Sequence, residues 1–163
     1  MQKHYQLTDE ETSQTLHDKL AVIGAQAMLE TLDCLAAGEI QAKPQDNQHA
    51  TYAQKITKEE ALLDWSRSAE KLACEIRAFN PWPVAYTSWH EKSMRIWSAK
   101  ALNETHDLEP RTIIRASREG LDIAAGQGVL RLLQVQLPGG KVMPIADFYN
   151  ARQHDLVPGE HFI

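Results

Sequence analysis

The sequence predicts an α+β fold that is mainly β, in which an OB-like five-stranded barrel follows a helical segment. Three features of the chain predict it. Residues 1–38 have the apolar periodicity of a helix, residues 39–57 are polar, and residues 84–137 contain five short β-rich runs separated by turn residues. Five strands with helices at either end are the elements of an OB-like barrel, a fold whose open groove often binds nucleic acid.

The first predicted helix starts near Thr8 and ends at Gly38. Thr8 or Asp9 can cap its amino end, and Gly38 can adopt the left-handed conformation that stops a helix. Gly24 is expected to break or kink the helix midway. Its apolar residues recur at steps of three and four, namely Leu16, Leu20, Ile23, Met28, Leu32 and Leu35.

A linker is predicted at residues 39–57, because this stretch holds a proline, several amides and little apolar periodicity. It separates residues 1–38 from a carboxy-terminal domain at residues 58–163. A second helix is predicted at residues 66–79 of that domain, where one face is apolar and the other charged. Asn80-Pro81 ends this helix, because the residue before a proline avoids helical angles.

Five strands are predicted after Pro83, at residues 84–89, 94–102, 111–117, 121–126 and 129–137. Polar or glycine-containing turns separate them, among them Gly126-Gln127-Gly128, so consecutive antiparallel pairing is the simplest topology. A last short helix is predicted at residues 144–151, with Pro144 in its first turn. The tail is expected to run out through Pro158-Gly159.

Composition limits the class of protein. The contents of 43% apolar and 24% charged residues are those of a globular chain, and no apolar run approaches the roughly 20 residues that cross a bilayer. Residues 1–11 have neither the basic start nor the apolar stretch of a secretory signal, so we expect a cytoplasmic protein with no membrane partner. Cys34 and Cys74 are expected to be free thiols within helices.

The sequence contains no recognisable catalytic motif. Its seven histidines include no pair with the helical spacing of a zinc site, and the GxSxG, Walker and GxGxxG patterns are absent. Nothing in the spacing of the 22 carboxylates singles out an acid and base pair. The sequence therefore predicts neither a catalytic residue nor a metal site.

Charge is distributed unevenly along the chain. Residues 1–52 carry three lysines against eight carboxylates, whereas residues 53–163 carry fourteen basic and fourteen acidic residues. The basic residues of the second region fit either a solvated surface or contacts with phosphates. Arg111 and Arg115 are four residues apart, so an extended strand would place both on one face. The tryptophans fit either core packing or stacking on bases in a groove, and they are Trp65, Trp82, Trp89 and Trp97.

Four segments resemble methionyl-tRNA formyltransferases in sequence, order and spacing. IRAFNPWPVAYT at residues 76–87 is similar to the signature that opens the carboxy-terminal domain of that family. ATYAQKITKEEALLDW at residues 50–65 resembles the family's linker and the start of this domain, and DFYNARQHDLVPGEHF at residues 147–162 resembles its terminal helix and tail. Residues 5–46 are similar to the final strand and helices of the family's formyl-transfer domain.

The resemblance implies that residues 1–38 are the last strand and helices of a Rossmann-like formyl-transfer domain, whose catalytic motifs precede this stretch. It also implies that the full-length enzyme uses 10-formyltetrahydrofolate as co-substrate, and that this chain binds no folate and is inactive alone.

The partner implied for residues 58–163 and the linker is initiator methionyl-tRNA, in translation initiation. Basic residues would neutralise its phosphates. Residues 109–111 depart from the glycine-containing turn common in the family, which changes the local edge of the groove. The residues expected to contact tRNA are Lys55, Lys58, Arg77, Arg111, Arg115, Arg118 and Lys141.

Two other interpretations stay open. A related formyltransferase acting on a sugar nucleotide or a small amine would use the terminal domain for packing, although the FNPWP motif and the linker lysines favour the tRNA enzyme. Alternatively, the apolar helix faces of residues 1–38 would make the chain a structural module that forms a homodimer or a domain swap.

Overall fold

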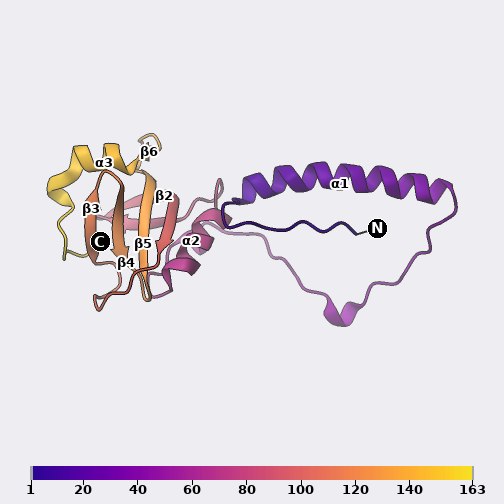
Figure 1. Ribbon diagram of the computed structural model, residues 1–163, viewed down its shortest axis with the longest axis horizontal. Helices are drawn as coiled ribbons and strands as arrows, with labels where there is room; N and C mark the ends of the chain where they lie inside the picture. Colours follow the sequence, from indigo (N-terminus) through magenta and orange to yellow (C-terminus); the bar gives the residue numbers. More distant parts are fainter. Residues whose placement is uncertain (1, 163) are drawn as a thin grey trace. The chain divides into compact units, whose positions relative to one another are not determined.

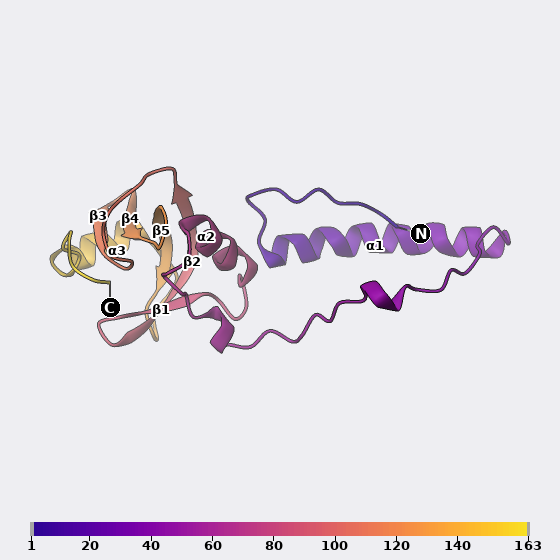
Figure 2. The ribbon, with the colours of Figure 1, turned by 90° about the horizontal axis from the view of Figure 1, so that it is seen from below.

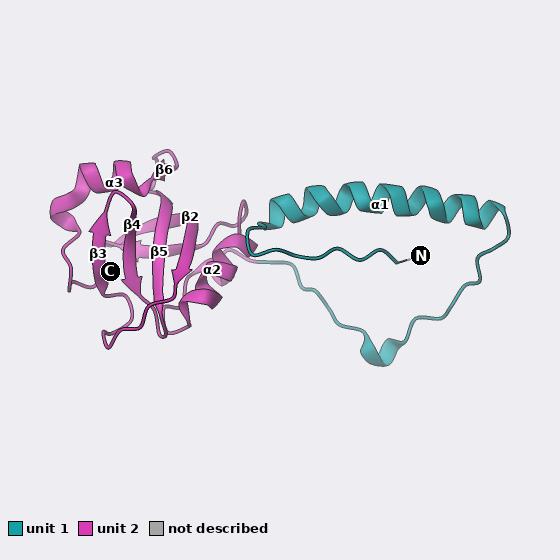
Figure 3. Cartoon of the chain, in the orientation of Figure 1, with its two compact units in different colours: residues 1–56 teal, residues 57–163 magenta. Residues whose placement is uncertain are grey.

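The computed structural model describes residues 2–162 and divides into two compact units, unit 1 (residues 1–56) and unit 2 (residues 57–163) (Figure 3). The division falls at the end of the predicted linker. Residues 39–57 are exposed throughout, as expected for a polar stretch that contributes nothing to a core.

Unit 1 consists mainly of one long helix, α1 (Ser13–Ala36), followed by a short 3₁₀ turn, η1 (Asn47–His49) (Figure 1). Thr12 caps α1: its hydroxyl accepts the Thr15 N–H at 3.3 Å, and the Thr15 hydroxyl accepts the Thr12 N–H at 3.0 Å. The predicted cap at Thr8 or Asp9 is wrong, because the Thr8 N–H donates to the Glu11 carboxylate at 2.8 Å in the turn before the helix.

Helix α1 continues through Gly24, so the predicted break is wrong. A glycine inside a helix costs only about 1 kcal/mol relative to alanine, which a helix of 24 residues can absorb. Gly38 has a φ of 74° just after the helix, as predicted. The described part of unit 1 contains no strand, whereas the resemblance implied one before the helices.

The segment before α1 runs back along the helix (Figure 1). Lys3 Nζ lies 2.5 Å from a carboxylate oxygen of Glu30, and Lys19 Nζ lies 2.6 Å from one of Glu11. The Tyr5 hydroxyl also donates to Glu11. The hydrogen bonds from Lys19 and Tyr5 lower the pKa of Glu11 to about 2. These polar contacts therefore hold the segment before α1 along the helix.

The apolar side chains of α1 are left uncovered, because none of its residues is buried. An amphipathic helix normally buries such a face against another element. The large apolar side chains that α1 exposes are Leu20, Val22, Met28, Leu29, Leu32 and Leu35.

Unit 2 is an α+β domain built on a six-stranded antiparallel sheet, which confirms the predicted fold class (Figure 1). The strand order is β1-β2-β5-β4-β3, and β6 pairs with β5. In residues 2–162 no pairing joins β1 to β3, so the sheet stays open and does not close as a barrel. The strands are β1 (Tyr86–Trp89), β2 (Lys92–Leu102), β3 (Ile113–Ser117), β4 (Gly120–Ala124), β5 (Val129–Gln136) and β6 (Met143–Pro144).

The predicted consecutive pairing is wrong at one place, because β2 pairs with β5 and not with β3. The apolar strand β5 buries Leu130, Leu132 and Val135 and takes a central position between β2 and β4. Strand β3, which carries the exposed Arg115, lies at the edge. Charged residues are common on edge strands, where they oppose further pairing.

Helix α2 (Ala69–Ala78) packs against β2 and β5, and it lies beside β2 in both views (Figure 1 and Figure 2). Ser68 caps it by accepting the Lys71 N–H, so the helix starts three residues later than predicted. The 3₁₀ turn η2 (Glu59–Ala61) precedes α2 in the chain. The buried face of α2 is formed by Ala69, Leu72, Ala73 and Ile76.

Helix α3 (Ile145–Arg152) and the 3₁₀ turn η3 (Gln153–Asp155) follow β6. Pro144 belongs to β6 and precedes the helix, rather than forming its first turn. The tail does not run out into solvent as predicted. Its Gly159 N–H donates to the Ile113 carbonyl and its Glu160 carbonyl accepts the Ile113 N–H, each at 2.8 Å, while the Phe162 side chain is fully buried. Burial of the apolar Phe162 side chain in the core explains why the tail returns to the domain.

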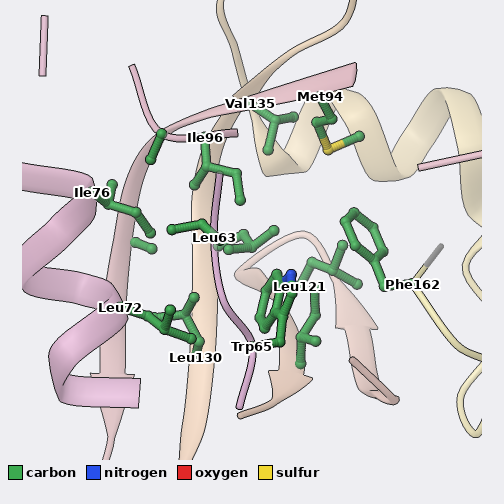
Figure 4. Packing of buried hydrophobic residues seen from close by; sticks show 14 of the residues in the cluster. Leu63, Trp65, Leu72, Ile76, Met94, Ile96, Leu121, Leu130, Val135 and Phe162 are labelled. Atoms are coloured by element: carbon green, nitrogen blue, oxygen red, sulfur yellow. The ribbon is translucent and has the colours of Figure 1, made fainter. Parts of the chain in front are cut away.

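A single hydrophobic core lies within unit 2 (Figure 4). Figure 4 shows Leu63 and Trp65, which precede α2, among side chains from α2, the strands and the tail. Trp65 and Trp89 are core residues, 2% and 4% exposed, and the Trp65 Nε1–H donates to the Thr87 hydroxyl at 2.9 Å. For these two tryptophans the core interpretation is therefore correct.

Among residues 2–162 no helix is long and apolar enough to span a bilayer. In the same range, no group of three His, Cys, Asp or Glu residues is arranged so that it could hold a metal ion. Cys34 and Cys74 are free thiols, the first half-buried and the second exposed.

Candidate nucleic-acid interface

The FNPWP motif forms a loop between α2 and β1. The Val84 N–H donates to the Phe79 carbonyl at 2.9 Å, which closes the loop, and the Asn80-Pro81 and Trp82-Pro83 peptide bonds are cis. The Asn80 Nδ2–H donates to the Trp97 carbonyl at 3.0 Å and so attaches the loop to β2. The Trp82 side chain projects at the surface and is 52% exposed.

A groove of about 490 Å³ lies beside this loop, which we call the aromatic groove. On β2, Met94 and Ile96 are buried, while the alternate residues Ser93, Arg95 and Trp97 face outward to line the groove. The full lining is Lys58, Glu59, Pro81, Trp82, Pro83, Val84, Tyr86, Ser93, Arg95 and Trp97.

The position of Trp97 is fixed by a chain of hydrogen bonds. Its Nε1–H donates to Gln136 Oε1 at 3.0 Å, and Gln136 Nε2–H donates to the Gly140 carbonyl at 2.8 Å. A second hollow, of about 220 Å³, is lined by Gln136 and the turn after it and shares Ser93 and Arg95 with the aromatic groove. Lys141 follows this turn directly and is exposed.

The charge of the aromatic groove is positive. Its basic side chains, Lys58 and Arg95, form no ion pair with any residue in the described range 2–162, and both are exposed. Glu59 is the one carboxylate among the lining residues described above. Hydrogen bonds from its own backbone N–H and from the Thr57 side chain lower the pKa of Glu59, so it is ionised at neutral pH. The groove therefore carries two positive charges and one negative charge.

Another hollow, of about 500 Å³, lies at strands β3 to β5 and has the opposite balance of charge. Here Arg115 Nε donates to Asp122 at 2.8 Å and its Nη2 to Glu104 at 2.8 Å, while Arg131 Nε donates to Asp122 at 2.6 Å. Glu119 also lines this hollow, so three carboxylates face two arginines. Arg115, which was predicted to contact tRNA, instead forms ion pairs with Glu104 and Asp122.

The other arginines predicted to contact tRNA lie in separate parts of the domain. Arg77 is half-buried in the last turn of α2, where its Nη2 donates to Cys74 Sγ at 3.3 Å. Arg118 donates to Asn150 Oδ1 at 3.1 Å. Arg111 precedes β3 with a φ of 76°, and a bulge separates Ile113 from Arg115, so the argument that Arg111 and Arg115 share a face does not apply.

The two predicted lysines near the linker fall in different units. Lys58 lies in unit 2 at the aromatic groove, just before η2. Lys55 lies in unit 1, where it is exposed outside any helix or strand and forms no ion pair within residues 2–162.

Sequence reasoning missed Arg95, Tyr86 and Ser93 as lining residues. The signal was present in β2, where buried Met94 and Ile96 alternate with Ser93, Arg95 and Trp97. The exposure of Trp82 had a weaker signal, because flanking prolines keep a residue out of helices and central strands. The approach of Lys58 to β2 depends on tertiary packing that no local pattern encodes.

The domain is an open antiparallel sheet with flanking helices, and its surface carries a basic, aromatic groove. The chain belongs to the formyl transferase, C-terminal domain family, whose model matches residues 55–153. The matched range covers the aromatic groove and every strand.

Curated relatives extend the match over nearly the whole chain. A methionyl-tRNA formyltransferase of Coxiella burnetii (strain RSA 331 / Henzerling II) is 47% identical over 154 residues, which are 94% of this chain and 49% of the relative. The protein of the same name from strain CbuK_Q154 is 46% identical over the same length. This chain therefore spans about half the length of the curated relatives it matches.

A solved structure shares the fold. A variant of HypX from Aquifex aeolicus superposes with a TM-score of 0.66 over 89% of this chain and 27% of that protein. The sequence identity is 15%, so the similarity concerns the fold alone.

Proposed function

We propose that this chain is the tRNA-holding portion of a methionyl-tRNA formyltransferase. Such an enzyme transfers a formyl group from 10-formyltetrahydrofolate to the amino group of initiator methionyl-tRNA in translation initiation, and we place it in the cytoplasm. The identity with proteins of that name, extending over nearly the whole chain, supports the proposal.

The observation that carries the proposal is the pair of exposed cations at the aromatic groove that form no ion pair within residues 2–162. Lys58 and Arg95 are exposed and unpaired within the described residues, beside the exposed Trp82. Cations of this kind neutralise phosphates and release counterions, which supplies most of the affinity for nucleic acid. In contrast, Arg115 and Arg131 already bind carboxylates, so they have less to offer a phosphate.

The role of the remaining predicted residues follows from their surroundings. Lys55 and Lys141 are exposed and form no ion pair within residues 2–162, and Arg111 and Arg118 add positive charge farther along the sheet. Phosphate contacts of this kind fix position and carry no sequence information. We propose that they orient the tRNA, that the formyl transfer takes place outside this chain, and that the chain alone is inactive and binds no folate.

Binding of initiator methionyl-tRNA tests the proposal. Wild type and the Lys55→Ala/Lys58→Ala variant are titrated with initiator tRNA and with an elongator tRNA at low and at moderate salt. We expect binding that weakens with salt and weakens further in the variant, because each lost phosphate contact removes a released counterion. A terminal domain from an enzyme for sugar nucleotides or small amines would bind neither tRNA even at low salt.

The exposed apolar side chains of α1 favour a second candidate function, self-association as a homodimer or a domain swap. Contiguous exposed apolar surface of this kind commonly marks an interface. Gel filtration with light scattering checks it: a dimer that becomes a monomer in the Leu29→Lys/Leu32→Lys variant supports self-association. A monomeric wild type at all concentrations contradicts it.

A further inference from the structure

The aromatic side chains of the groove take no part in the ring-to-ring contacts of the described core. Within residues 2–162 the ring-to-ring contacts join Trp65, Trp89, His90, Phe148 and Phe162, and none involves an aromatic residue of the groove. Trp82 is half exposed, although burying a tryptophan is normally among the larger apolar gains in a domain.

The groove has the size and composition of a site for a small planar group. Its volume of about 490 Å³ lies within the roughly 300–1,000 Å³ typical of ligand pockets. Trp82, Tyr86 and Trp97 supply aromatic surface, and Ser93 supplies a hydroxyl group. Because Trp97 is fixed through Gln136, this part of the wall is ordered before any ligand arrives.

The charges at the rim decide between two kinds of occupant. Grooves lined by aromatic residues also bind proline-rich peptides, which need no cation. Here Lys58 and Arg95 stand without a carboxylate partner in the described chain, and only Glu59 opposes them. A nucleotide matches this arrangement better, since its base offers a face for stacking and its phosphate a negative charge.

Resting on the proposed function, we propose that the aromatic groove takes one unpaired nucleotide of the bound tRNA. Its base stacks on Trp82, and Lys58 and Arg95 neutralise the adjacent phosphates. A base held in a duplex cannot offer its face, so the site selects an unpaired nucleotide.

Substitutions of Trp82 test the stacking. The full chain is titrated with the tRNA, with a short single-stranded RNA, and with a blunt duplex of the same sequence. Trp82→Ala should weaken single-strand and tRNA binding by about five- to hundredfold, the range for loss of one stacked base, and Trp82→Phe should restore most of it. Duplex binding and the salt dependence should not change, because no phosphate contact is removed.

The possible failures can be told apart. If Trp82→Ala binds the single strand as well as wild type while Lys58→Ala weakens tRNA binding, the stacking site is refuted and the proposed function stands. If wild type binds no tRNA at low salt, the proposed function fails. Binding of a proline-rich peptide in place of the single strand overturns the nucleotide site. Thermal unfolding verifies that Trp82→Ala is folded, as expected for a half-exposed side chain.

Discussion

Asp122 is a charged residue that is almost completely buried, with 1% of its surface exposed. A buried carboxylate is costly unless it is paired and hydrogen-bonded. Asp122 meets both conditions, since Arg131 donates to both of its oxygens and Arg115 to one. Burial alone raises the pKa of Asp122, but the hydrogen bonds and charges of Arg131 and Arg115 outweigh it, and the net pKa is lowered.

Asp122→Asn should destabilise unit 2 by about 2–3 kcal/mol, because it leaves two arginines partly uncompensated. The figure is below that for a fully buried pair, since the Arg115 side chain is 50% exposed. The folded pKa is depressed, so the stabilisation is present above the unfolded value of about 3.9 and is lost as pH falls through the folded pKa. Urea unfolding at pH 7 and pH 3 measures it. An equal difference between wild type and variant at both pH values contradicts the account.

Glu59 opposes the two cations of the aromatic groove, so its removal should strengthen tRNA binding. Glu59→Gln keeps the shape of the side chain and deletes its charge. We expect about two- to fivefold tighter binding at low salt, the size of an exposed charge interaction, and little difference at high salt. Glu91→Gln, on the turn before β2 and outside the groove lining, is the matched control. Weaker binding by Glu59→Gln would show that the groove does not meet a polyanion.

At this scale the charge of each residue could be read from the sequence, but its partners in the fold could not. Lys58 was found through a resemblance, and it does line the groove. Arg115 has the same charge, but pairing with Asp122 and Glu104 cannot be read from spacing, because these residues meet only after β3 and β4 pair. The outward position of Arg95 on β2 could be read from the strand alternation, but the groove around it could not, because its lining residues come from separate segments of the chain.

At the scale of the elements, the loop at residues 125–128 connects the sheet to α2 and the segment before it through backbone hydrogen bonds. The predicted turn Gly126-Gln127-Gly128 does connect β4 to β5, and Gly128 has a φ of 75°. The turn also forms backbone hydrogen bonds that the hydrophobic periodicity of the sequence does not predict. The Gly126 N–H donates to the carbonyls of Trp65 and Arg67, at 2.8 and 2.9 Å, and the Gln127 carbonyl accepts the Ala69 N–H at 2.8 Å.

Gly126→Ala should be strongly destabilising, because a Cβ there would lie 1.8 Å from the Ser66 carbonyl oxygen. We expect a loss of at least about 2 kcal/mol, in the range of overpacking and backbone displacement. Gly24→Ala is the contrast: a Cβ there meets nothing within 4 Å, so it should stabilise α1 by roughly 0.5–1 kcal/mol. Denaturant unfolding of both variants decides the matter, and a Gly126→Ala protein as stable as wild type would contradict the described packing.

The elements themselves were largely predictable, since strand alternation and helix periodicity are local signals. Strands β1 to β5 and the last helix lie within a few residues of their predicted bounds. Pairing was not predictable in the same way, because no local pattern states that β5 must lie between β2 and β4. The return of the tail likewise depends on Phe162 finding a place in the core, a contact between residues far apart in the chain.

At the scale of the whole molecule, the core belongs to one unit. Every residue of the hydrophobic cluster lies between Leu63 and Phe162, and α1 buries none of its own residues. Unit 2 therefore has what a domain needs to fold by itself. A chain starting at Thr57 should unfold cooperatively with a Tm within about 4 °C of the full chain, equivalent to less than about 1 kcal/mol. A broad, non-cooperative transition in calorimetry would contradict this expectation.

We propose that the basic aromatic groove of unit 2 holds tRNA. The most direct measurement is the affinity for initiator methionyl-tRNA over a series of salt concentrations, for wild type, Arg95→Ala and Lys100→Ala. Both residues are exposed on β2, but only Arg95 lines the groove. We expect that Arg95→Ala weakens binding and lowers the slope of log K against log salt by about 1, while Lys100→Ala leaves both near wild type. Equal effects of the two substitutions, or none from Arg95→Ala, would contradict it.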